Sequence, residues 1–343
     1  MEKERDNILD ILLTNKTEIN ECGVYFRSYI PSAFIAAALP LRSIKKSVFI
    51  RKYNDITMKL ASGSKVPFGK YGRLLLTVLT THAVINKNMA PDQSIQINYK
   101  SLNQLLKELQ LPSSRGTDIK EQLDYFKECT FIFERKIIKI AQASLFHDYL
   151  DNGTINVLGD EIKATKISTG VIPFLKGMEY IELEDRKKNK QHIGLTIWLS
   201  QDFVKFSQEH SVPIDYTVYK KITSAIGKDI YAWLVYRNNS IKDSLFISRE
   251  ALVSQFMPID DNSHHDQLRT NYDYIKEQIK TIKQKYYPNL KVEFDMVNFG
   301  ITLYKSEVQI LSDDKRYILR LDIHNPHIFV ALVSQISKVK VVL

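Results

Sequence analysis

The side chains best suited to chemistry in this sequence are basic residues at helical spacing in its C-terminal third. Apolar residues that step by three and four positions predict one buried helix face there. They are Leu268, Tyr272, Ile275, Ile279, Ile282 and Tyr286. A neighbouring stripe of the same helix is basic, and it consists of Arg269, Lys276, Lys280 and Lys283. A helix of this kind can bury one side and present cations to a polyanion on another.

A second helix, about 150 residues earlier, has the same design. Ile119, Leu123 and Phe126 predict its buried side, and Lys120 and Lys127 lie beside that side. Taken alone, either helix could be an ordinary surface helix, because lysine and arginine are mostly exposed in any protein. The repeated surroundings of the two helices favour a functional interpretation.

The elements around the two basic helices recur in the same order. Each basic helix follows a long apolar helix and then a short helix opened by serine, and strand-like runs come after it. The paired segments are Arg73 to Val84 and Asp229 to Tyr236, then Ser101 and Ser248, then Thr130 to Ile140 and Leu290 to Leu303. Three helices and a hairpin form the winged-helix variant of the helix-turn-helix, whose last helix enters the DNA major groove. The sequence therefore predicts an α+β fold with tandem winged-helix domains.

We expect the two domains to occupy most of the chain. The predicted division is an N-terminal extension (1–45), a first winged-helix domain (46–208), a second (209–306) and a C-terminal extension (307–343). The C-terminal extension contains the apolar run Ile328 to Val333, which is too apolar for a solvated linker, and packing within the chain is favoured over packing on a partner.

Positive charge is concentrated between Arg42 and Arg73. This segment holds nine basic residues and the single acid Asp55, which gives it +8 of the net +9 of the chain. The nine are Arg42, Lys45, Lys46, Arg51, Lys52, Lys59, Lys65, Lys70 and Arg73. Neutralising phosphates with such residues releases counterions, so the segment favours the backbone of a nucleic acid. The alternative is a basic, soluble edge without a partner.

A second basic cluster falls at a predicted hairpin tip. Met178 to Leu183 and Ile193 to Leu199 read as strands, and the turn between them holds Arg186, Lys187 and Lys188. Such a tip could contact a phosphate or the minor groove. A solvated charged turn explains the composition equally well.

Signals of enzymatic chemistry fail on spacing. The stretch Gly63 to Lys70 resembles a phosphate-binding loop but lacks the following serine or threonine. His264 and His265 are adjacent, so they cannot both point one way from a strand as paired metal ligands would. We therefore expect no catalytic residues, no metal and no cofactor.

Cysteine usage and hydropathy indicate the compartment. Only Cys22 and Cys129 are present, without a C-x-x-C pair, which disfavours a disulfide framework. No uncharged apolar run is long enough to span a bilayer. We expect a cytoplasmic protein without a membrane partner.

Seven segments in order resemble the plasmid RepA-type replication initiators. They are Val66 to Leu76, Ile197 to Phe203, Val212 to Asp215, Asp229 to Arg237, Ala251 to Phe256, Tyr286 to Pro288 and Ile301 to Ser306. The resemblance covers approximately Val66 to Ser306. The loop Pro112 to Asp118 departs from the pattern, since it has only Gly116 where a more glycine-rich turn is expected.

The resemblance implies a protein that binds repeated double-stranded DNA sites at a plasmid origin, helps to open the duplex and recruits the host initiator and replicative helicase. It also implies two winged-helix domains, and it allows a homodimer and repression of the protein's own gene. A tandem winged-helix transcriptional repressor without origin activity is the alternative, because it would share the electrostatic features.

Recognition helices read DNA with their N-terminal residues, which selects the candidate contacts. In the second domain we expect His265, Gln267, Arg269, Thr270 and Asn271 to meet base edges or nearby phosphates, and Lys276, Lys280 and Lys283 to bind phosphate. In the first domain the candidates are Arg115, Thr117, Lys120 and Lys127. Phosphate contacts are also expected from Arg51, Lys52, Lys59, Lys65, Lys70, Arg73, Arg186, Lys187 and Lys188.

Overall fold

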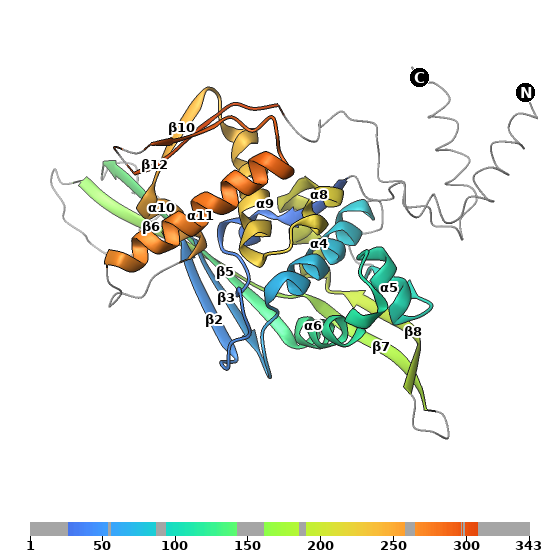
Figure 1. Ribbon diagram of the computed structural model, residues 1–343. Coiled ribbons are helices and arrows are strands. Elements are labelled where there is room, and N and C mark those ends of the chain that lie inside the picture. The colour runs from blue at the N-terminus through green and yellow to red at the C-terminus, as the bar shows by residue number, and fades with distance from the viewer. Residues whose placement is uncertain are drawn as a thin grey trace, which may run out of the picture.

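The protein has a mixed α+β fold, seen here in a computed structural model (Figure 1). The structure describes residues 27–53, 56–86, 94–142, 161–184, 190–257, 265–295, 297 and 299–307. The predicted C-terminal extension and the turn with Arg186, Lys187 and Lys188 lie outside these residues. The predicted domain boundaries remain predictions.

One structural unit begins with the long helix α4. Its elements are α4 (Gly69–Ile85), β4 (Gln96–Tyr99), α5 (Leu102–Glu108), α6 (Gly116–Glu128), β7 (Leu175–Glu184) and β8 (Lys190–Leu199). The strands β7 and β8 form the predicted hairpin, and β4 pairs with β8 to give the sheet order β4-β8-β7. We call this set the first unit.

A second unit repeats this order of elements. It consists of α9 (Ala225–Ser240), β10 (Ser244–Ser248), α10 (Arg249–Phe256), α11 (His265–Lys285), β11 (Val292–Asp295) and β12 (Gly300–Tyr304). Its sheet order is β10-β12-β11, so the strand before the second helix again pairs with the last strand of the hairpin. The Ser248 side chain accepts a hydrogen bond from the Ala251 amide and caps α10, as predicted.

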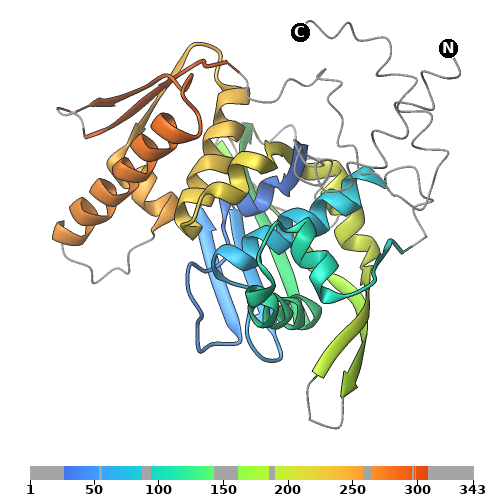
Figure 2. The same cartoon turned by 45° about the vertical axis from the view of Figure 1, so that its right-hand side comes forward.

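The third helix of each unit buries the face that the spacing predicts. Ile119, Leu123 and Phe126 of α6 are buried, as are Ile275, Ile279 and Ile282 of α11. The helix α6 packs on α4, and α11 packs on α9. Figures 1 and 2 both show α4 and α9 near the centre, with α6 beside one and α11 beside the other.

The run Thr130 to Ile140 is a strand, as predicted, but it does not belong to the sheet of the first unit. This run belongs to β5 (Cys129–Gln142), which pairs with β3 (Ile56–Ser62) on one side and β6 (Glu161–Pro173) on the other. With β2 (Val48–Tyr53) these strands form a separate sheet of order β2-β3-β5-β6. Strand propensity identified the run as a strand, but pairing depends on partners that are distant in the sequence.

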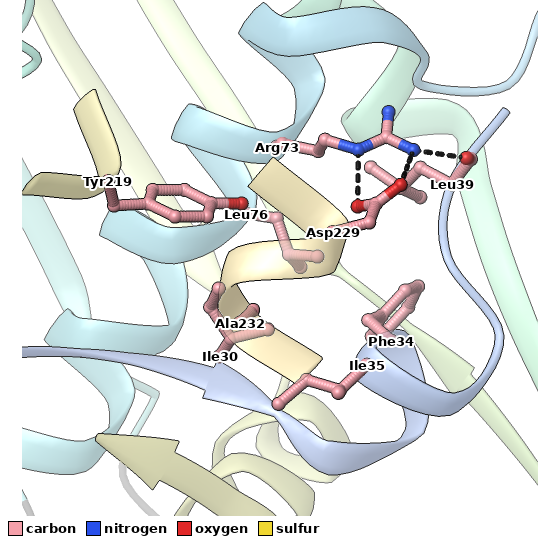
Figure 3. A pocket seen from close by; sticks show the side chains of 9 residues that line it. All are labelled: Ile30, Phe34, Ile35, Leu39, Arg73, Leu76, Tyr219, Asp229 and Ala232. Atoms are coloured by element: carbon pink, nitrogen blue, oxygen red, sulfur yellow. Dashed lines mark hydrogen bonds and ion pairs between the residues drawn. The ribbon is translucent and has the colours of Figure 1, made fainter. Parts of the chain in front are cut away.

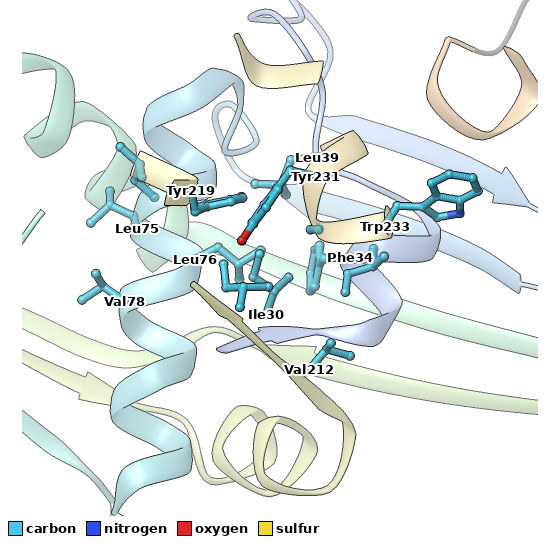
Figure 4. Close-up of a cluster of buried hydrophobic side chains, with 14 of the residues drawn as sticks. Ile30, Phe34, Leu39, Leu75, Leu76, Val78, Val212, Tyr219, Tyr231 and Trp233 are labelled. Carbon is cyan, nitrogen blue, oxygen red and sulfur yellow. The ribbon is translucent and has the colours of Figure 1, made fainter. Parts of the chain in front are cut away.

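The remaining elements connect the two units. They are β1 (Arg27–Pro31), α3 (Ser32–Ala36), α7 (Gln201–His210), β9 (Ser211–Asp215) and α8 (Tyr216–Lys221). The strands β1 and β9 pair antiparallel, and α3 and β1 pack against α9 and α4 respectively. Figure 4 shows Ile30 and Phe34 near Leu76 of α4 and Tyr231 of α9, in an apolar core that both units share.

A buried ion pair joins the first helices of the two units. Arg73 of α4 and Asp229 of α9 form a bidentate contact, with Nε to Oδ1 and Nη2 to Oδ2 distances of 2.6 Å each. The remaining guanidinium hydrogens are donated to the carbonyls of Leu39, Pro40 and Gly69. Figure 3 shows the pair beside a cavity of about 10 Å³, which has room for a water molecule and no larger ligand.

The side chain of Arg51 links β2 to the second unit. Its guanidinium is buried and donates to the Gln255 carbonyl of α10 at 2.7 Å. The Gln255 amide in turn donates to the carbonyls of Ile35 and Ala36 at 3.1 and 2.7 Å. Burial lowers the pKa of Arg51 to about 10, so the guanidinium stays charged at neutral pH. This network holds the second helix of the second unit against α3 and β2.

Lys228, next to Asp229 in α9, is a third buried cation. Its ammonium donates to the Tyr219 carbonyl and lies 4.5 Å from the centre of the Tyr219 ring. Burial, and then the positive charges of Arg73 and Lys70, lower the pKa of Lys228 to about 7. The folded state therefore releases the Lys228 proton far more readily than the unfolded state does.

We predict that Arg73→Met destabilises the protein by about 3–5 kcal/mol, because it leaves the Asp229 carboxylate buried without its partner. Urea unfolding of the variant measures this loss. The double variant Arg73→Met/Asp229→Leu should recover part of it, since no buried charge then lacks a partner. A loss below about 1 kcal/mol in the single variant would contradict a structural role for the pair.

The buried Lys228 should make stability rise with pH. Its pKa is about 7 when folded and about 10.4 when unfolded, so between these values the unfolded state binds more protons. Stability is then lowest below pH 7 and increases as the pH rises toward about 8, below the ordinary titration of cysteine and tyrosine. We expect the urea midpoint to rise over this window in the wild type and to change less in Lys228→Met. Equal pH profiles for the two proteins would refute the prediction.

Candidate nucleic-acid interface

The first unit gathers cations and aromatic rings around the start of α4 and along α6. The ammonium of Lys70 lies 5.0 Å from the centre of the Tyr71 ring, and the Arg115 guanidinium lies 6.0 Å from the same centre. Lys65 is 5.8 Å from the centre of the Tyr125 ring. Lys65, Lys70 and Arg115 are exposed. The fold thus brings Lys70 to the predicted reading end of α6 and Lys65 to the C-terminal half of the same helix.

Nearby acids partly balance this cluster. Arg115 lies 3.4 Å from Asp118, and both side chains are largely exposed, so the pair is weak. Tyr125 donates its hydroxyl hydrogen to Glu121. Burial and this hydrogen bond raise the pKa of Tyr125 to about 12, so the phenol remains protonated. Thr117 is exposed one residue after the start of α6.

In the second unit the exposed residues near the start of α11 include Gln267, Arg269 and Thr270. The Thr270 hydroxyl donates to the Asp266 carbonyl, so its oxygen is tied to the helix backbone. His265 opens the helix, and its side chain lies outside the described residues. The described part of the structure thus leaves Arg269 as the exposed cation of this helix end.

Asn271 does not have the position that base contact requires. Its side chain is buried, and its amide donates to the Met257 carbonyl at 3.4 Å. The spacing placed Asn271 near the reading end, but at 100° per residue it falls on the side of α11 that faces α10. It connects the two helices instead of reading DNA.

The basic flank of each third helix lies against an aromatic residue of the adjoining hairpin. Lys276 and Lys280 of α11 lie 5.6 and 5.8 Å from the centre of the Phe294 ring in β11. Lys120 of α6 lies 4.7 Å from the centre of the Tyr180 ring in β7. Cations on aromatic faces are attracted by the ring quadrupole. Sequence analysis missed both rings, although each occupies the first strand of its hairpin.

The most outward line of each helix is acidic, not basic. Exposed acids on α11 are Asp266, Asp273 and Glu277, and those on α6 are Glu121 and Glu128. Lys280 forms an ion pair of 2.6 Å with Glu277. Because carboxylates repel phosphate, the surface suited to DNA is the flank between helix and hairpin. Partly exposed Lys283 continues this flank on α11, and exposed Lys127 continues it on α6.

The basic segment does not form one patch. Arg51 and Arg73, both predicted to bind phosphate, are buried at 5% and 2% exposure and bound to protein groups. These two predictions are wrong, because carbonyls and the Asp229 carboxylate take the place of phosphate. Lys52 is exposed and Lys59 partly exposed on the sheet β2-β3-β5-β6, while Lys65 and Lys70 join the cluster at α4 and α6. The fold therefore separates charges that are adjacent in sequence.

The described residues contain no group of three or more histidines, cysteines or acids that could hold a metal ion. Cys129 lies in the core, where burial raises the pKa of its thiol to about 12 and keeps it neutral. None of the helices in the described part of the chain has the length and apolar content that crossing a bilayer requires.

The chain matches no protein-family model and no curated protein at a significant level. Two solved structures resemble it at 10% sequence identity, and both comprise domains 2 and 3 of RctB. One, a selenomethionine derivative, has a TM-score of 0.47 and covers 82% of this chain and 100% of its own. The other has a TM-score of 0.44 and covers 81% of this chain and 98% of its own. Likeness at this level does not assign the chain to a family.

Proposed function

We propose that this protein is a plasmid replication initiator. It binds repeated double-stranded DNA sites at an origin through two winged-helix domains, helps to open the duplex and recruits the host initiator and replicative helicase. It represses its own gene by binding the promoter. The RepA-type resemblance of seven ordered segments between Val66 and Ser306 supports this function.

The observation that carries the proposal is the duplicated unit. Both units have the order helix, strand, helix, helix and hairpin, with β5 and β6 inserted before the hairpin of the first, and both sheets place the last hairpin strand in the middle. In each, cations of the third helix lie on an aromatic ring of the hairpin. In winged-helix proteins the third helix enters the major groove beside the hairpin, so phosphates would follow this basic flank.

The proposed contacts follow from exposure. Arg269 and Gln267 read base edges from the start of α11, while Lys276 and Lys283 hold the backbone. In the first unit Lys65 binds phosphate beside Tyr125 in the C-terminal half of α6, and Lys70 and Arg115, which share the Tyr71 ring, bind it at the start of that helix. Helix N-termini add their partial positive charge there.

A transcriptional repressor with two winged-helix domains is the second candidate. The same duplicated units support this function, because a repressor needs only to bind DNA. The DNA around the gene distinguishes the two functions. Direct repeats beside an A·T-rich stretch favour an initiator, because such sequence is easily deformed, whereas a lone inverted repeat over the promoter favours a repressor.

The first experiment is a gel-shift titration against the DNA that flanks the gene, run at several salt concentrations. We expect specific binding whose affinity falls steeply with salt, because several phosphate contacts release counterions. The variant Lys276→Gln should reduce the slope of log affinity against log salt by about 1. Equal affinity for the flanking DNA and for a random duplex would contradict an origin-binding function.

The second experiment tests base readout by Arg269. If it forms a bidentate base contact, Arg269→Ala should cost roughly 1–3 kcal/mol of binding free energy on the specific site and much less on random duplex. Lys285→Ala is the matched control, since Lys285 is also exposed on α11 but lies in its last turn, away from the basic flank. Unchanged binding of Arg269→Ala to both DNAs would exclude this role.

A further inference from the structure

The turn of the second hairpin carries an exposed apolar surface. Phe246 of β10, Val297 in the turn and Phe299 at its end are 47%, 83% and 50% exposed. We call these three residues the apolar tip. Single exposed apolar side chains are common on proteins, but an exposed group at one loop end indicates a contact surface.

The backbone holds this tip in a strained conformation. Phe299 has a φ of +47°, which is unfavourable for a residue with a bulky side chain. Two hydrogen bonds of 2.8 Å tie the end of the turn to α10 and α11. The Arg249 amide donates to the Phe299 carbonyl, and the Tyr272 hydroxyl donates to the Gly300 carbonyl. Strain of this kind persists only where the surrounding structure enforces it, and it concentrates at binding sites.

Gly300 leaves room for the aromatic ring of Phe246 at this position. A Cβ there would come within 2.7 Å of the Phe246 ring and 2.5 Å of the Ile247 carbonyl oxygen. Only glycine therefore permits the approach of β10 and β12 at the register Ser248 to Gly300. The Phe246 ring is thus held beside the turn and extends the apolar tip sideways.

Positive charge borders the tip. The Arg249 guanidinium lies 5.1 Å from the centre of the Phe299 ring, and β11 leads back from the turn to Phe294, on which Lys276 and Lys280 rest. The acids near the turn are engaged: Glu250 pairs with Arg249 at 3.0 Å, and Asp295 accepts the Val297 amide at 2.8 Å. The tip is therefore continuous with the basic flank of α11.

We propose that the apolar tip inserts between base steps of duplex DNA from the minor groove and partly unstacks them. This proposal rests on the proposed DNA-binding function and deepens it, because it gives the protein a wedge that begins duplex opening. Phosphates on either side would contact the flank of α11 and Arg249. Proteins that insert apolar side chains in this way kink the duplex by roughly 20–90°.

The turn of the first hairpin has a different composition from that of the second. Its turn region holds Arg186, Lys187, Lys188 and Lys190 in the sequence, whereas the stretch Asp295 to Gly300 of the second hairpin has no basic residue. A cationic turn suits phosphate contact, and an apolar one suits insertion between stacked bases. The first hairpin would bind the phosphate backbone of the DNA, and the second would unstack its bases.

The test uses the full chain with Val297→Ser/Phe299→Asn. Asparagine tolerates positive φ, so the turn keeps its shape while the apolar surface is removed. Val171→Ser is the matched control, since Val171 is also an exposed valine, 60% exposed, but lies on β6 of another sheet. Two probes are made from the DNA that flanks the gene. One carries a fluorescent adenine analogue in the bound segment and reports unstacking, and the other is a set of circularly permuted fragments whose gel mobility measures the bend.

For the wild type and Val171→Ser we expect a bend of roughly 20–90° and a rise in fluorescence that reports unstacking. The tip variant should lose both and bind roughly tenfold more weakly, with an unchanged salt slope because its phosphate contacts remain. Equal bending by the tip variant and the wild type would overturn the proposal and leave the proposed function intact. Unchanged bending combined with a loss of self-association in sedimentation would also overturn the proposal, because the tip would then be a contact between copies of the protein. Failure of the wild type to bind duplex DNA at any salt would overturn the proposed function itself.

Discussion

The ion pair between Arg73 and Asp229 is the interaction on which the arrangement of the molecule depends. It joins α4 to α9 across 156 residues of sequence, with both side chains buried. Because α6 packs on α4 and α11 packs on α9, the pair also sets where the two basic helices lie relative to each other. A buried pair of this kind adds little to net stability, because the cost of removing both charges from water offsets their attraction, but the loss of either partner is costly.

The second connection between the units, through Arg51 and Gln255, restrains other elements. It fixes α10 to β2 and α3, so the second unit is held at two separate places. The two units also share the apolar core between α4 and α9 (Figure 4). Together these contacts favour a fixed spacing between the two helices and therefore between the DNA segments that they would contact.

Within each unit the basic residues lie on the side of the third helix that faces the hairpin, not on its most outward line. The rings of Tyr180 and Phe294 support lysines there, and exposed acids occupy the outward line. This distribution would position a phosphate backbone along the hairpin and repel it from the centre of the helix. The different compositions of the two hairpin turns fit the proposed division between phosphate contact and insertion.

The sequence by itself determined the features that depend on local spacing. The apolar steps of Ile275, Ile279 and Ile282 identified the buried face of α11, and strand propensity located β7 and β8, because period and propensity act over a few residues. Tertiary structure alone decided the partners of β5, the burial of Arg73 and Arg51, and the turning of Asn271 toward Met257. The sequence around a basic residue does not distinguish an exposed side chain from one that binds a buried carboxylate. Asp229 lies far along the chain, so only the fold could show that Arg73 binds it and not a phosphate.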